Sequence, residues 1–94
     1  MNIYKISQSK NNGYDTYDSA VVVAKSTTAA RKIYPSGSAI WKNGEWCWET
    51  MRGEERYHAY CWVQHIDDVE VEYIGSAGAL FTEPQVLVAS FNAG

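Results

Sequence analysis

The chain has 94 residues, of which 46% are hydrophobic, and a formal net charge of −3. This length suits one compact domain and is too short for two, so residues 1–94 are treated as a single domain. The acidic balance, without any Lys/Arg-rich block, disfavours a protein that binds nucleic acid through its phosphates. No window is long and apolar enough to span a bilayer, and the first residues lack the apolar core of a signal peptide, so we expect a cytoplasmic protein without a membrane partner.

The N-terminal region predicts two strands that pair with each other. Residues 1–7 alternate apolar and polar side chains, as a short strand does. The run SAVVVAK (residues 19–25) is continuous and β-branched, which suits an interior strand covered on both faces. Between them, Asn12-Gly13 and the repeated Tyr-Asp pairs of YDTYD (residues 14–18) predict a reversal of the chain.

A short helix is predicted next. Ser26 is a favourable N-cap for TTAARKIY, whose alanines favour helix and whose basic residues fall in the last turn. Pro35 and Gly37 stop it. Because so short a helix is marginal by propensity, it needs packing against a sheet.

An aromatic segment, about residues 39–63, holds all four tryptophans and both cysteines. Asn43-Gly44 lies between Trp41 and Trp46 and predicts a hairpin. A second reversal near residues 52–55 would link strands over 46–50 and 57–63. The alternative is a helix over 54–62, which the weak helix propensities of Tyr, His, Cys and Trp disfavour. We interpret the segment as a hairpin insertion.

The C-terminal part predicts two more strands. After Asp67, the sequence DVEVEY places apolar side chains on one face and carboxylates on the other, as in a half-buried strand. Residues 75–85 form a loop whose apolar Ala-Leu-Phe packs back over the core, and residues 86–91 form the last strand. The predicted class is α+β: a mainly antiparallel or mixed sheet of five or six strands with one short helix on one face.

Three segments carry a family resemblance. NNGYDTYDSAVV (residues 11–22), VEYIGSA (71–77) and ASFNAG (89–94) resemble a group of small, mostly uncharacterised proteins of bacteriophages and prophages. The aromatic segment is outside this resemblance. The resemblance implies an accessory phage role in the bacterial host cytoplasm and offers no catalytic residues to transfer. Small acidic phage proteins of this kind often bind and block a host protein, as anti-CRISPR and other anti-defence inhibitors do.

A metal site is the first chemistry that the aromatic segment suggests. Zinc could accept the thiolates of Cys47 and Cys61 and the imidazoles of His58 and His65. The spacing fits poorly, however, because His58 and Cys61 would point to opposite faces of a strand. A disulfide between the two cysteines is a further alternative, and two buried free thiols are favoured over both. We expect no metal and no cofactor.

Catalytic signatures are also weak. No G-x-S-x-G elbow or similar local motif brings a nucleophile, a base and an oxyanion donor together. Residues 75–78, Gly-Ser-Ala-Gly, lack the lysine and third glycine of phosphate-binding loops. We expect a protein that is not an enzyme and that has no catalytic residues.

Two features remain as candidate contact surfaces. Alternate carboxylates on the acidic strand could mimic a row of phosphates, although a charged face that maintains solubility is the favoured interpretation. In the aromatic segment, tryptophans and tyrosines of opposite parity cannot all be hidden, so we expect part of it to contact a host or phage protein. The candidate residues are Trp41, Trp46, Trp48, Tyr57, Tyr60, Trp62, Asp68, Glu70 and Glu72.

The predicted function is therefore non-catalytic binding to a protein partner, with inhibition of a host defence system as the specific hypothesis. Two alternatives stay open. One is a nucleic-acid-associated or regulatory module of phage replication, and the other is a minor phage protein that assembles with itself through its edge strands.

Overall fold

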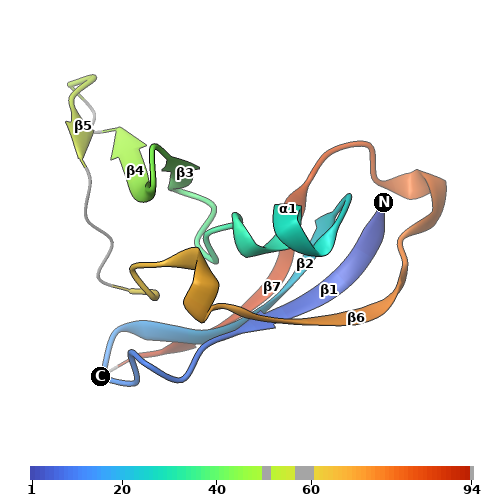
Figure 1. The fold of residues 1–94 in the computed structure, drawn as a ribbon, viewed down its shortest axis with the longest axis horizontal. Coiled ribbons are helices and arrows are strands. Elements are labelled where there is room, and N and C mark those ends of the chain that lie inside the picture. The colour runs from blue at the N-terminus through green and yellow to red at the C-terminus, as the bar shows by residue number, and fades with distance from the viewer. Residues whose placement is uncertain (50–51, 57–60, 94) are drawn as a thin grey trace.

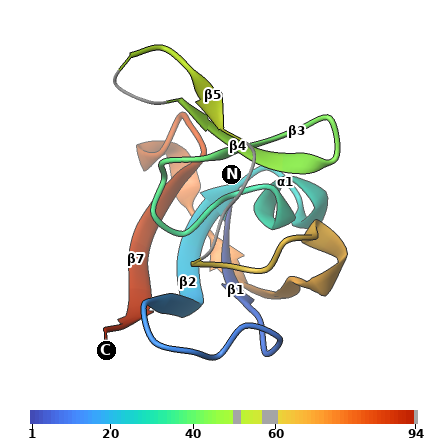
Figure 2. The same ribbon diagram turned by 90° about the vertical axis from the view of Figure 1, so that its left-hand side faces the viewer.

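The computed structural model describes residues 1–49, 52–56 and 61–93. These residues form two antiparallel sheets, one α-helix and two short 3-10 helices (Figures 1 and 2). In chain order the elements are β1 (Asn2–Ser7), β2 (Thr16–Ala24), α1 (Thr27–Arg31), β3 (Ile40–Lys42), β4 (Glu45–Glu49), β5 (Glu55–Arg56), η1 (Ile66–Asp68), β6 (Glu70–Ser76), η2 (Gly78–Leu80) and β7 (Gln85–Asn92).

The larger sheet has the strand order β6-β1-β2-β7. The predicted pairing of the first two strands is confirmed, with Tyr4 opposite Val22 and Ile6 opposite Ala20. The interior position of β2 is also confirmed, because β1 and β7 flank it. β2 begins at Thr16, earlier than predicted, because its first residues pair with the end of β7, where Tyr17 faces Phe91.

The predicted helix is confirmed but shorter, ending at Arg31. The Ser26 hydroxyl accepts a hydrogen bond from the backbone N–H of Ala29 at 3.1 Å, which caps the helix. α1 contacts β1, β2 and β6, so it covers one face of the larger sheet, as the sequence predicted (Figure 1).

A second sheet has the order β3-β4-β5, which corrects the prediction of a single sheet of five or six strands. The Asn-Gly hairpin pairs β3 with β4, and neither strand joins the larger sheet. On its other side, β3 makes an isolated antiparallel bridge between Ile40 and Ile33. The end of the predicted strand 57–63 is also wrong. Trp62 and Val63 are neighbours and both buried, which a strand with only one covered face does not allow. Residues 57–60 lie outside the described part.

One hydrophobic core joins these elements. It combines side chains of β1 and β2 with Ala30 of α1, Trp46 of β4 and the segment before β6. The chain between β2 and β6 therefore folds over the same face of the larger sheet (Figures 1 and 2). Among the described residues, no helix is long and apolar enough to cross a membrane.

Candidate protein-contact surface

The aromatic hairpin turns at Asn43 and Gly44, whose φ angles of 54° and 81° are the left-handed values that a two-residue hairpin turn requires. The turn places Trp41 directly opposite Trp46. Their rings meet edge to face, with centroids 5.1 Å apart. Both indoles therefore lie on one face of the small sheet, the face that packs toward the core.

Two of the candidate tryptophans are core residues. Trp46 is 2% exposed, its Nε1 donates a hydrogen bond to the carbonyl of Val63 at 2.8 Å, and its ring packs edge to face on Tyr34. Trp62 is 0% exposed, and its buried Nε1 has no hydrogen-bond partner among the described residues. Burial removes Trp46 and Trp62 from any contact surface, which corrects their place among the candidates.

The remaining aromatic candidates differ in exposure. Trp41 is half-buried and its ring packs on that of His65, with centroids 5.6 Å apart. Trp48 is exposed, at 39%. Tyr57 and Tyr60 lie outside the described residues. Of the tryptophans, Trp48 is thus the one whose exposure suits a contact.

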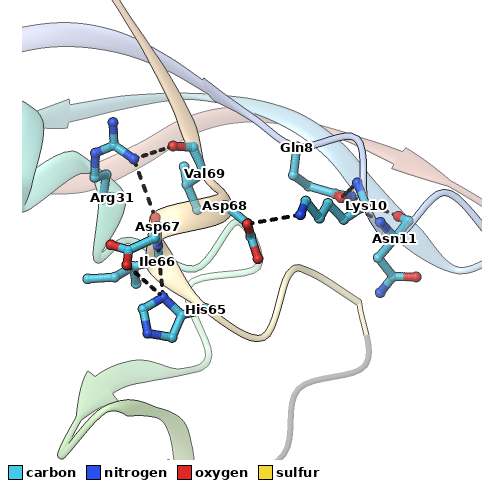
Figure 3. A network of polar contacts seen from close by, with 9 residues as sticks. All are labelled: Gln8, Lys10, Asn11, Arg31, His65, Ile66, Asp67, Asp68 and Val69. Atoms are coloured by element: carbon cyan, nitrogen blue, oxygen red, sulfur yellow. Dashed lines mark hydrogen bonds and ion pairs between the residues drawn. The ribbon is translucent and has the colours of Figure 1, made fainter.

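Both cysteines are free thiols, with Cys47 buried and Cys61 partly exposed. Within residues 1–49, 52–56 and 61–93, no three His, Cys, Asp or Glu side chains gather as a metal site would need. His58 of the predicted constellation lies outside these ranges. His65 is held locally: its Nδ1 accepts a hydrogen bond from the backbone N–H of Asp67 at 3.1 Å (Figure 3).

Tyr34 and Cys61 meet in the core. Burial raises the pKa of Tyr34 to about 12, and the adjacent Cys61 thiol contributes to the rise. The backbone carbonyl of Cys61 in turn accepts a hydrogen bond from the N–H of Tyr17 at 2.8 Å. The phenol therefore stays protonated at neutral pH.

The predicted alternation holds at the start of β6, where Val71 is half-buried and Glu70 and Glu72 are exposed. It is wrong at Tyr73, which was predicted on the covered face and is 59% exposed. Basic side chains lie beside two carboxylates of this region, however: Glu72 on β6 and Asp68 in η1. Lys5 of β1 lies directly opposite Glu72, and the Lys10 ammonium is 3.4 Å from the Asp68 carboxylate (Figure 3). This neutralisation favours the interpretation of a solvated face over that of a phosphate mimic.

Gln8 organises the loop that contains the Tyr-Asp pairs. Its side chain is buried, its Nε2 donates to the carbonyls of Asn11 and Tyr17, both at 2.8 Å, and its Oε1 accepts from the N–H groups of Lys10 and Asn11. Figure 3 shows Gln8 beside Lys10 and Asn11. The amide thus satisfies the turn backbone from inside, which the sequence analysis did not anticipate.

An open groove of about 470 Å³, which no sequence pattern predicted, lies between the segment after α1 and the start of β7. Ile33, Ile40, Pro84 and Val86 give it apolar walls, with Lys32 at its margin. Ile40 is 62% exposed, among the most exposed large apolar side chains described. Strand alternation could have predicted the exposure of Ile40, though not the groove, because Ile40 has the opposite parity to the inward-facing Trp41.

No protein-family model, no curated protein and no solved structure matches this chain significantly. The class of the molecule therefore comes from its geometry, which defines a small α+β domain with two antiparallel sheets. Within it, the groove beside β7 and the exposed Ile40 and Trp48 are the features that suit contact with another protein.

Proposed function

We propose that this chain is a small phage or prophage accessory protein that acts in the bacterial host cytoplasm by binding a host protein and blocking it. The binding is non-catalytic and uses the groove between residues 32–40 and the start of β7. Inhibition of a defence system, in the manner of anti-CRISPR proteins, is the specific form of this proposal.

The observation that carries the proposal is the exposure of Ile40 beside the groove. An isoleucine that is 62% exposed, next to the half-buried Ile33 and Val86, offers a continuous apolar surface that a partner can cover. Lys32 at the margin favours a partner segment that carries a carboxylate beside its apolar side chains. The phage-like segments at the two ends of the chain supply the support for a bacterial host.

The test is an affinity capture from bacterial lysate with the tagged protein, followed by quantitative mass spectrometry. We expect one host protein in stoichiometric amount, lost with Ile40→Glu and retained with Ile74→Glu. Ile74 is a matched control because it is 52% exposed and lies on β6, at the opposite edge of the larger sheet from β7. Capture of no stoichiometric protein, or undiminished capture by a folded Ile40→Glu variant, would falsify the proposal.

A further inference from the structure

β7 is an edge strand of the larger sheet. It pairs with β2 on one side, and none of the strands in the described part of the chain pairs with its other side. The outward backbone N–H and C=O groups of an edge strand form a template for a further strand. The outer edge of β7 can therefore accept another strand through these backbone groups.

Protein edges are usually protected by charged side chains, prolines or short length. β7 has eight residues, QVLVASFN, none of them charged and none proline. Its pairing with β2 shifts register twice: once at Asp18 of β2, between the pairs of Tyr17 and Ser19, and once at Leu87 of β7, between the pairs of Val86 and Val88.

The other edge of the sheet is different. β6 has Glu70 and Glu72 exposed along it. A second β6 approaching this edge would bring like carboxylates together, which is unfavourable. The two edges thus differ in charge, and only β7 lacks charged side chains.

Apolar side chains lie on both faces of β7. Val88 is 60% exposed, and it lies opposite Val21 on the face away from α1. Phe91 is exposed as well, and its ring packs on that of Tyr17 on the covered face, with centroids 4.8 Å apart. A strand placed alongside would cover Val88 on one face and Phe91 on the other.

We infer that two copies of this chain pair through β7, antiparallel across a two-fold axis, and so join their four-stranded sheets into one. Such an interface is isologous: the same surface of both copies forms it, so each contact between two different residues occurs twice, related by the two-fold axis. Because β7 has no charged residue, self-pairing brings no like charges together. The net charge of −3 comes from residues outside β7, so the strand itself adds no charge repulsion when two copies meet along it.

Sedimentation velocity of the purified protein alone, over micromolar to millimolar concentrations, tests this inference independently of any host target. We expect the mass to rise from monomer to dimer. Val88→Lys should keep the protein monomeric, because its ammonium would meet a second ammonium or an apolar edge. Ile74→Lys on β6 is the matched control and should dimerise like the unmodified protein. A monomer at every concentration, or equal effects of the two lysines, would overturn the inference.

Hydrogen exchange of the unmodified protein supplies a second measurement that needs no substitution. The amides of residues 87–91 should exchange more slowly at the concentration where the mass doubles. If the mass doubles while these amides exchange at an unchanged rate, the copies meet at another surface and the β7 pairing is wrong.

Discussion

The indole Nε1 of Trp46 donates a hydrogen bond to the backbone carbonyl of Val63, at 2.8 Å in the core. This bond connects the small sheet to the segment that leads into β6, two parts of the chain 17 residues apart. It also distinguishes Trp46 from Trp62, whose buried Nε1 has no hydrogen-bond partner in the part of the chain that the structure describes.

We therefore expect Trp46→Phe to destabilise the protein more than Trp62→Phe. Both substitutions remove similar volume from the core, but only the first leaves a buried carbonyl unsatisfied, which costs about 1–3 kcal/mol. Urea denaturation of the two variants measures the difference in the free energy of unfolding. Equal destabilisation, or the reverse order, would contradict the assigned hydrogen bond.

Arg31 anchors α1 to the start of β6. Its guanidinium donates to the carbonyls of Val69 and Ile66 (Figure 3). Arg31→Met should cost about 1.5–3 kcal/mol, as expected for hydrogen bonds from a charged donor. The adjacent Lys32 is exposed, so Lys32→Met should change the free energy of unfolding by no more than about 0.5 kcal/mol. Thermal denaturation of the two variants measures their losses in the free energy of unfolding. Similar losses would show that Arg31 does not hold the helix through these carbonyls.

Gln8→Glu should destabilise the loop that contains the Tyr-Asp pairs. The introduced carboxylate would face the carbonyls of Asn11 and Tyr17, which now accept hydrogen bonds from the Gln8 amide. Burial beside carbonyls raises the pKa of such a carboxyl above that of the unfolded chain, so the penalty is largest at neutral pH. It should shrink as the pH falls toward about 4, where the protonated acid can donate one hydrogen bond.

Denaturant titrations of this variant and the wild type at several pH values measure the penalty. Gln85→Glu is the matched control, because Gln85 is exposed and its amide donates to the nearby carbonyl of Glu83. A penalty for Gln8→Glu that does not depend on pH would argue against these carbonyls as the cause.

Tyr34 should make stability depend on pH in the alkaline range. Its pKa of about 12 in the folded protein lies above the ordinary value of 10.0, so the folded state retains the proton that the unfolded chain loses. The resulting stabilisation is complete below pH 10.0 and is lost as the pH rises toward 12, at up to about 1.4 kcal/mol per pH unit.

Tyr34→Phe removes this contribution, so its free energy of unfolding should fall less steeply between pH 10 and 12 than that of the wild type. Denaturant titrations across this range test the slope, and Tyr14→Phe at an exposed position is the control. Parallel pH profiles for wild type and Tyr34→Phe would show that the phenol ionises as readily in the fold as outside it.

Local sequence signals predicted the elements whose geometry is decided by near neighbours. Ser26 caps α1, and Asn43-Gly44 turns the hairpin, because each acts through backbone groups a few residues away. The alternation at the start of β6 likewise marked Glu70 and Glu72 as exposed, although it wrongly placed Tyr73 on the covered face. These predictions needed no knowledge of distant parts of the chain.

The candidate contact residues were harder to predict, because exposure depends on what packs against each side chain. Trp46 and Trp48 share a parity in β4, yet one is buried and the other exposed. No local pattern distinguishes them. The groove beside Ile40 also forms between segments far apart in sequence, so residue order does not reveal it.

By itself, the sequence determined the α+β class, the central pairing of β1 with β2, the helix cap and the Asn-Gly hairpin, since short-range backbone preferences and strand alternation specify them. Only the tertiary structure decided that the strands form two sheets, that Trp46 and Trp62 are core, and that β7 is an uncharged edge. These properties depend on long-range packing, where the burial of apolar area selects among arrangements that the local sequence allows equally.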